Sequence, residues 1–216
     1  NNCDIYYYST SLKQVSKQQM ISYIVGNNKE HIMFAGPFAK IFKRSFIYQE
    51  DITFKKGIIN GEDMLFNLEV LLKTDNFQIV SKSFYQYRIY IGSTTKKFDD
   101  RIVASDKEFQ KSLNEILVNS NLEKEWQAKI SNYCLYNAIF TIAYRIAFIQ
   151  KFQKARDKFS FLKEKPYVNI EKKKDKLNDY SLKKKIVFFF IRQKQYYLVY
   201  WILRFAIQNS KTEKEY

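Results

Sequence analysis

The second half of the chain contains no glycine after residue 100 and a single proline, Pro166. Glycine and proline are the residues that most often interrupt regular structure. A long stretch that almost lacks them therefore favours helices. Apolar residues recur there at helical spacing, which predicts one helix over Arg101–Asn119 and a longer one within Leu122–Lys158. The middle of the longer helix, Ile139–Ile149, is apolar on almost every side, so we expect it at the centre of a helical bundle.

The rest of this half carries one polar stretch and two short apolar runs. Phe159–Tyr180 includes a charged run and is predicted to be a linker. Ile186–Ile191 and Tyr196–Ile207 are apolar, but both are shorter than the roughly 18 residues that a membrane-spanning helix needs. We therefore predict no transmembrane helix.

Positive charge is concentrated in the same half. The chain has a net charge of +15. Residues 1–100 hold 13 basic and 10 acidic residues, and residues 101–216 hold 24 and 12, so the second half carries +12 of that charge. Such a field favours an anionic partner: nucleic acid, an acidic membrane face or a phosphorylated substrate. The two cysteines, Cys3 and Cys134, lack metal-binding spacing and suit a reducing cytoplasm as free thiols.

The first half mixes short β-type segments with helical ones. Ile5–Thr10, Phe77–Val80 and Phe84–Tyr90 are rich in β-forming residues and are predicted strands. The stretch Ser11–Lys29 is predicted to contain one short helix that ends near Gly26. This mixture predicts an α/β organisation before residue 99.

Two carboxylates open a helix in the middle of this half. Glu62 and Asp63 follow the loop signal Asn60-Gly61 and precede an apolar set at helical spacing. Free N–H groups and the helix dipole favour negative charge in a first turn. Taken alone, the pair indicates only a charged helix start.

Four segments of the first half form an ordered set, which consists of Gly36–Ser45, Ile58–Phe66, Tyr85–Arg88 and Gly92–Thr94. They comprise an amphipathic Lys-containing segment after a small residue, Gly-Glu-Asp with an aromatic residue three positions after the aspartate, Tyr-x-Tyr-Arg and a Ser-containing loop. The set resembles the C-terminal half of the catalytic domain of bacterial family 2 glycosyltransferases. The resemblance covers about residues 1–98, and the ordered set is more specific than any one segment.

The resemblance implies an α/β fold: an incomplete, Rossmann-like GT-A half over residues 1–98, followed by an all-helical region over 99–216. It implies inverting transfer of a sugar from a nucleotide sugar to a hydroxyl of a saccharide or lipid-linked saccharide, in cell-surface polysaccharide or glycoconjugate synthesis. The family's catalytic base is the second acid of the Glu-Asp pair, which falls on Asp63. Glu62 then binds the acceptor or orients the base.

The family also uses a divalent metal, Mg or Mn, held by an Asp-x-Asp motif. No two aspartates of this chain are separated by one residue, and the adjacent pair Asp99-Asp100 lies beyond the resembling region. We therefore expect the motif upstream of Asn1. On this interpretation the chain alone binds no metal and does not turn over.

Further candidate substrate-binding residues are Arg88, Ser93, Thr94 and Lys40. Hydroxyls and cations suit phosphate oxygens, so the first three either contact the diphosphate or a phosphorylated acceptor, or belong to a solvated loop. Lys40 either reaches the active site or lies on the exposed face of its segment, and we favour the exposed face.

The basic helical tail has several interpretations. It lies peripherally on the inner face of a membrane, with Phe188–Ile191 and Tyr196–Ile207 dipping into anionic lipid, or it is a bundle with a solvated Lys-rich surface. It also suits a homo-oligomer paired through Tyr196–Ile207. The rival function is a non-enzymatic basic module for nucleic acid or an anionic membrane. Against nucleic acid, no helix-turn-helix or RNA-binding signature is present.

Overall fold

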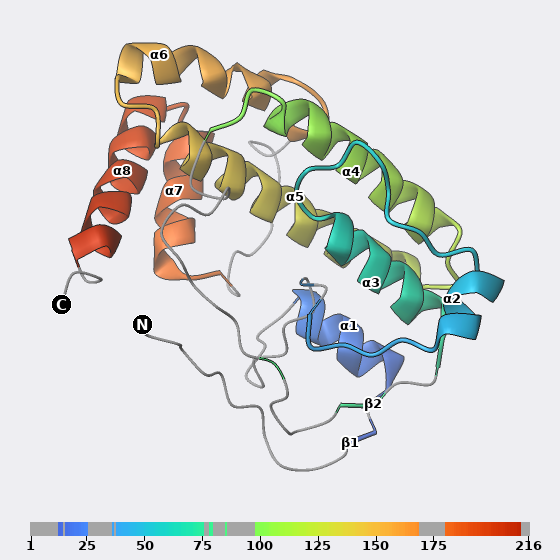
Figure 1. Ribbon diagram of the computed structural model, residues 1–216. Coiled ribbons are helices and arrows are strands. Elements are labelled where there is room, and N and C mark those ends of the chain that lie inside the picture. The colour runs from blue at the N-terminus through green and yellow to red at the C-terminus, as the bar shows by residue number, and fades with distance from the viewer. Residues whose placement is uncertain are drawn as a thin grey trace. The chain divides into compact units, whose positions relative to one another are not determined.

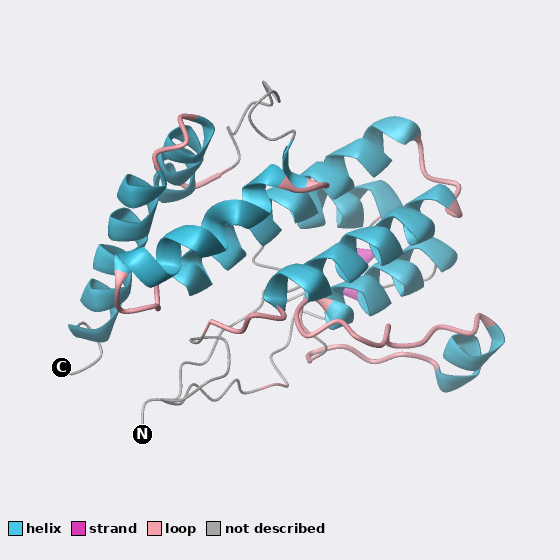
Figure 2. Cartoon of the chain, turned by 90° about the horizontal axis from the view of Figure 1, so that it is seen from above, coloured by secondary structure: helices cyan, strands magenta, loops and turns pink. Residues whose placement is uncertain are grey.

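The computed structural model describes residues 13–14, 16–25, 36, 38–75, 78–79, 85, 98–168 and 180–212, and their regular structure is mainly helical (Figures 1 and 2). The helices are α1 (Lys17–Val25), α2 (Arg44–Gln49), α3 (Glu62–Lys73), α4 (Ile102–Val118), α5 (Lys124–Ile146), α6 (Phe152–Arg156), the 3₁₀ helix η2 (Asp157–Lys163), α7 (Leu182–Arg192) and α8 (Tyr196–Thr212). Within these ranges, the only paired strands are the short antiparallel segments β1 (Lys13–Gln14) and β2 (Gln78–Ile79).

The prediction of an α/β half over residues 1–98 is therefore wrong. A Rossmann-like fold is built on a mostly parallel sheet of several strands, whereas the described residues hold a single antiparallel pair of two-residue strands. The fold of the described part is all-helical. A few short β-type segments cannot stabilise a sheet without further strands beside them, whereas a helix satisfies its hydrogen bonds within one segment. The predicted strands at 5–10 and 84–90 lie outside the described residues, apart from Tyr85.

Several helical predictions are confirmed. The short helix expected within Ser11–Lys29 is α1, which ends at Val25. The helix expected over Arg101–Asn119 is α4, and the longer one within Leu122–Lys158 is α5. The amphipathic segment after Gly36 becomes helical only at Arg44, where α2 begins.

Contacts group the chain into two compact units that interleave along the sequence. Unit 1 combines Asn1–Ile91 with Ser105–Tyr133, and unit 2 combines Gly92–Ala104 with Cys134–Tyr216. The single boundary expected near residue 98 does not follow this grouping. Helices α4 and α5 each contribute residues to both units.

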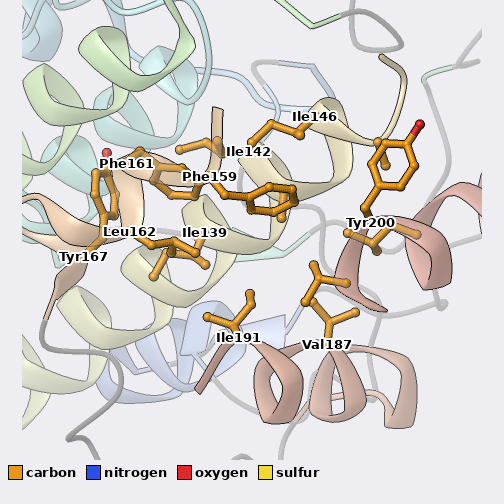
Figure 3. Packing of buried hydrophobic residues seen from close by; sticks show 14 of the residues in the cluster. Ile139, Ile142, Ile146, Phe159, Phe161, Leu162, Tyr167, Val187, Ile191 and Tyr200 are labelled. Carbon is orange, nitrogen blue, oxygen red and sulfur yellow. The ribbon is translucent and has the colours of Figure 1, made fainter. Parts of the chain in front are cut away.

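The core of unit 2 is built around the second half of α5. Ile139, Ile142 and Ile146 are buried there, as predicted for the centre of a bundle. Figure 3 shows these side chains among residues from η2, α7 and α8. The buried partners include Phe159, Phe161, Leu162, Tyr167, Val187, Ile191, Tyr200 and Leu203.

The predicted linker at Phe159–Tyr180 is wrong for its first nine residues. Phe159, Phe161 and Tyr167 are almost completely buried, and the ring of Phe161 packs edge-on against Tyr167 at 5.1 Å between centroids. The residues up to Lys163 belong to the 3₁₀ helix η2 rather than to an α-helix. The buried face of a 3₁₀ helix recurs every three residues and not at the α-helical spacing by which a buried face is recognised. The polar residues between the aromatics therefore led to the linker prediction. The charged run after Asn169 lies outside the described residues.

Helix α7 bears on the two interpretations of the tail. Phe188 and Ile191, which dip into lipid on the membrane interpretation, are buried in the core of unit 2 as in a bundle, and Phe189 between them is exposed. The predicted absence of a transmembrane helix agrees with the structure, since no helix of the described ranges is both long and apolar enough to cross a bilayer.

Candidate functional site

The candidate site begins at Gly61, the residue before α3. Gly61 adopts φ 96° and ψ 5°, a left-handed conformation that favours glycine. A Cβ atom at this position would lie 2.9 Å from Cε2 of Phe109 on α4, so the space also requires glycine. Both acids, Glu62 and Asp63, consequently lie in the first turn of α3, where the sequence predicted them.

Asp63 is half-buried, and its Oδ1 accepts a hydrogen bond from the N–H of Met64 at 2.8 Å. This N–H is among the first four of the helix, which have no partner within the helix itself. The positive end of the helix dipole attracts the carboxylate charge at the same place. Residue 63 is therefore a half-accessible carboxylate at a helix N-terminus.

A second segment folds back on this turn through the carbonyl oxygen of Gly36. The side-chain amide of Asn67 on α3 donates to it at 3.0 Å, and Nζ of Lys40 donates to it at 2.6 Å. Asn67 is buried and lies one turn after Asp63, so both side chains project from the same side of α3. The Gly36 carbonyl thus links the Lys40 segment to the start of α3.

Lys40 is half-buried, so the favoured prediction of an exposed Lys40 is wrong. Burial lowers the pKa of the Lys40 ammonium from its ordinary 10.5 to about 8, and the nearby Asp63 carboxylate partly opposes this shift. The preceding residue, Ala39, has φ 57°, a left-handed conformation that costs a non-glycine residue about 1–2 kcal/mol. The bond from Lys40 to Gly36 closes this strained turn.

Aromatic contacts join three of the four segments that carry the glycosyltransferase resemblance. Phe38 stacks on Tyr85 with ring centroids 5.0 Å apart. Phe66 on α3 packs edge-on against Phe42 at 5.4 Å and stacks on Phe54 at 4.5 Å. Segments 36–45, 58–66 and the start of 85–88 therefore meet around the first turns of α3.

The structure brings together some of the predicted site residues. Lys40 and Asp63 are electrostatic neighbours, and Glu62, also half-buried, precedes Asp63 on α3. Arg88, Ser93 and Thr94 lie outside the described residues. Sequence reasoning missed Asn67, although one signal was present: it is an amide inside the apolar set of α3, four residues after Asp63.

The part of the chain that the structure describes does not fit the divalent metal that the resemblance implies. Among the described residues, no three His, Cys, Asp or Glu side chains are grouped closely enough to hold a metal ion. Asp99 accepts hydrogen bonds from Arg101, which is the main reason that its pKa falls to about 2, and Asp100 pairs with Lys158. Both carboxylates are thus paired with cations.

Neither a profile of a known protein family, nor a curated protein sequence, nor a solved structure matches this chain. The functional interpretation therefore depends on the residues themselves, on their order along the chain and on the geometry around α3.

Proposed function

We propose that this chain contributes the catalytic base to an inverting glycosyltransferase, which moves a sugar from a nucleotide sugar to a hydroxyl of a saccharide or lipid-linked saccharide. The observation that supports this most directly is the meeting of Lys40, Asp63 and Asn67 at the Gly36 carbonyl and the start of α3. Lys40 and Asp63 come from two segments that resemble the same family, and Asn67 directly follows the second of them.

In the proposed reaction, Asp63 accepts the proton of the acceptor hydroxyl. A neutral hydroxyl is a poor nucleophile, and a positioned carboxylate removes its proton as the oxygen attacks the anomeric carbon. The bond from that carbon to the nucleoside diphosphate breaks on the opposite side, and the diphosphate leaves with the electron pair. Attack opposite the leaving group inverts the anomeric configuration.

The neighbours of Asp63 have positioning roles in this proposal. The ammonium of Lys40 and the N-terminus of α3 both attract the charge of the carboxylate. Asn67 holds the Gly36 carbonyl, and through it the strained turn that carries Lys40. Glu62, next to the base, binds the acceptor or orients Asp63.

The test replaces Asp63 in the complete protein. Asp63→Asn keeps the size of the side chain but cannot accept the proton, so kcat should fall by about 10²–10⁴-fold with an unchanged thermal midpoint. Glu62→Gln, the matched substitution at the neighbouring acid, should lower kcat by a smaller factor. Transfer at the wild-type rate by Asp63→Asn would exclude the assigned base, and a retained anomeric configuration in the product would exclude the mechanism.

We also propose that the protein works peripherally at the inner face of a membrane. The charge of +12 over residues 101–216 and the exposed aromatic residues of α8 support this location. A lipid-linked acceptor would then share the surface with the enzyme. Flotation of the protein with anionic vesicles tests the location without reference to the reaction.

A further inference from the structure

Helix α8 buries one face and exposes an aromatic one. Val199, Tyr200 and Leu203 are buried in the core of unit 2. On the other side Tyr197, Trp201 and Phe205 keep 54%, 45% and 64% of their surface exposed. Their spacing of four residues places them in one row along the helix. A row of exposed large apolar side chains indicates an interaction site rather than a solvated surface.

This exposed row contains no charged side chain. Between residues 196 and 209 the only charged residue is Arg204. Its Nη1 donates to the carbonyl oxygens of Ala147 and Ile149, at 3.1 and 3.2 Å, and is thereby tied to the end of α5. The outward side of α8 is consequently aromatic and aliphatic as far as Phe205, with Leu198 beside the row and the uncharged polar Gln208 after it.

Helix α7, which packs against α8, has a similar exposed side. Leu182, Ile186 and Phe189 are exposed, whereas Val187 and Phe188 face the buried cluster to which α8 also contributes. At 100° per residue, Lys183 and Lys185 lie on the two flanks of the exposed apolar row. The helix therefore presents an apolar centre with basic borders, the pattern of helices that lie in a membrane interface.

The charged side chains within these two helices and the turn between them are all basic. From Tyr180 to Thr212 there is no Asp or Glu. The basic residues in that range are Lys183, Lys184, Lys185, Arg192, Lys194, Arg204 and Lys211. Of these, Lys184 is turned inward, since its Nζ donates to Asn137 Oδ1 at 2.7 Å.

We propose that the exposed faces of α7 and α8 dock on the surface of an anionic lipid bilayer. The row Tyr197, Trp201 and Phe205 enters the boundary between headgroups and acyl chains, and Lys183 and Lys185 contact lipid phosphates. Tyr and Trp suit this depth because each has an apolar ring and a polar atom. The inference rests on the proposed peripheral location and is independent of the proposed transfer reaction.

Charge complementarity selects the bilayer over a second copy of the chain. An isologous dimer through these faces would bring two sets of positive side chains together, and like charges across an interface are unfavourable. Anionic headgroups instead supply the opposite charge and attract each Lys or Arg near the surface.

The two tryptophans, Trp126 and Trp201, allow the surface to be mapped. Trp126→Phe leaves Trp201 alone on α8, and Trp201→Phe leaves Trp126 alone on α5 as the matched control. Vesicles of phosphatidylglycerol and phosphatidylcholine in equal parts should shift Trp201 emission to the blue, and bromine-labelled lipid should quench it. Emission from Trp126 should not change. Binding without quenching of Trp201 would overturn the assigned surface while leaving the peripheral location intact.

Two pairs of substitutions test the apolar and the electrostatic contributions to vesicle binding separately. Trp201→Ser with Phe205→Ser should lower vesicle partitioning about tenfold or more through lost apolar burial. Lys183→Gln with Lys185→Gln should lower it about ten- to thirtyfold at low salt. The control pair Lys111→Gln with Lys124→Gln removes the same charge from exposed sites on α4 and α5. This pair should lower vesicle partitioning by less than the Lys183 and Lys185 pair does.

The remaining outcomes separate this inference from its rivals. No vesicle binding by the unmodified chain would overturn both the surface and the peripheral location, and transfer to a water-soluble acceptor would still test the reaction. A concentration-dependent dimer that shifts Trp201 emission without lipid would assign the face to a second copy. An equal shift with a single-stranded oligonucleotide would assign it to nucleic acid.

Discussion

The side-chain amide of Asn67 donates a hydrogen bond to the main-chain carbonyl of Gly36 at 3.0 Å, across 31 residues of sequence. Lys40 donates to the same oxygen. This carbonyl group therefore helps to hold the Lys40 segment against the start of α3, so a substitution at Asn67 should alter the surroundings of Asp63.

Asn67→Ala should lower the free energy of unfolding by about 1–3 kcal/mol, because it removes a buried donor and leaves the Gly36 carbonyl with one partner fewer. In the proposed transfer reaction the same variant should reduce kcat while Asp63 is still present. Chemical denaturation and a transfer assay measure the two effects. Asn114→Ala, on the exposed side of α4, is the control and should change stability by at most about 0.5 kcal/mol. Equal stability of the two variants would show that the bond to Gly36 is unimportant.

Gly61 and Gly57 form a natural comparison. Both have positive φ, 96° and 81°, but a Cβ at residue 57 would have no atom within 4 Å, whereas at residue 61 it would meet the ring of Phe109. Gly57→Ala should destabilise by about 1 kcal/mol through backbone strain alone. Gly61→Ala should cost about 1–3 kcal/mol more, because the buried Phe109 ring must move. Thermal unfolding measures both, and equal losses would mean that the ring moves freely.

The Lys40 pKa gives a stability prediction with a definite sign. Burial lowers this pKa from 10.5 to about 8. Between these values the unfolded chain binds more protons at Lys40 than the folded chain does, so the free energy of unfolding should rise with pH and level off above 10.5. Partial exposure limits the rise to about 1–3 kcal/mol.

Lys40→Met removes the titrating group and should lose this part of the pH dependence, measured by denaturation between pH 7 and pH 11. Other groups also titrate in that range, so the comparison needs a control. Lys43→Met, three residues later at an exposed position, should keep the profile of the unmodified chain. If both variants behave alike, Lys40 is not buried in solution.

Phe159 and Phe189 test the corrected role of the stretch after α6. Phe159 is almost completely buried in the core of unit 2, whereas Phe189 on α7 is 58% exposed. Phe159→Ala should therefore cost about 3–5 kcal/mol of unfolding free energy. Phe189→Ala should change it by no more than about 0.5 kcal/mol. A mild effect of Phe159→Ala would restore the interpretation of this stretch as a linker.

The helices that the sequence predicted well are those whose apolar pattern is complete within one segment. Over α4 the apolar residues Ile102, Phe109 and Leu113 recur at helical spacing, with no glycine between them, and all three are buried. The apolar centre of α5 likewise required only the observation that its residues are apolar on every side. In both cases the pattern within one segment determined the outcome.

The predictions that failed depended on partners far along the chain. The strand predicted at Phe77–Val80 is present as β2, but whether it belongs to a larger sheet depends on which strands lie beside it, and alternation within the segment carries no such information. Lys40 looked exposed because its own segment is amphipathic, and its burial comes from α3, through Asn67 and the Gly36 carbonyl. Asp63 was identified from the order of motifs along the sequence. Its proximity to Lys40 arises only when the chain folds, so no pattern within one segment could predict it.

Helices α4 and α5 pass from one compact unit into the other, and this has a practical consequence for dissecting the protein. A polypeptide stopped at residue 98 would lack Ser105–Tyr133, which belong to the same unit as α3, and Phe109 would no longer lie against Gly61. A polypeptide that begins at residue 99 would keep Ser105–Tyr133 but lack the rest of unit 1. Truncation at any single peptide bond between the halves is therefore expected to yield aggregation-prone products, and functions of the two units are better separated by point substitution.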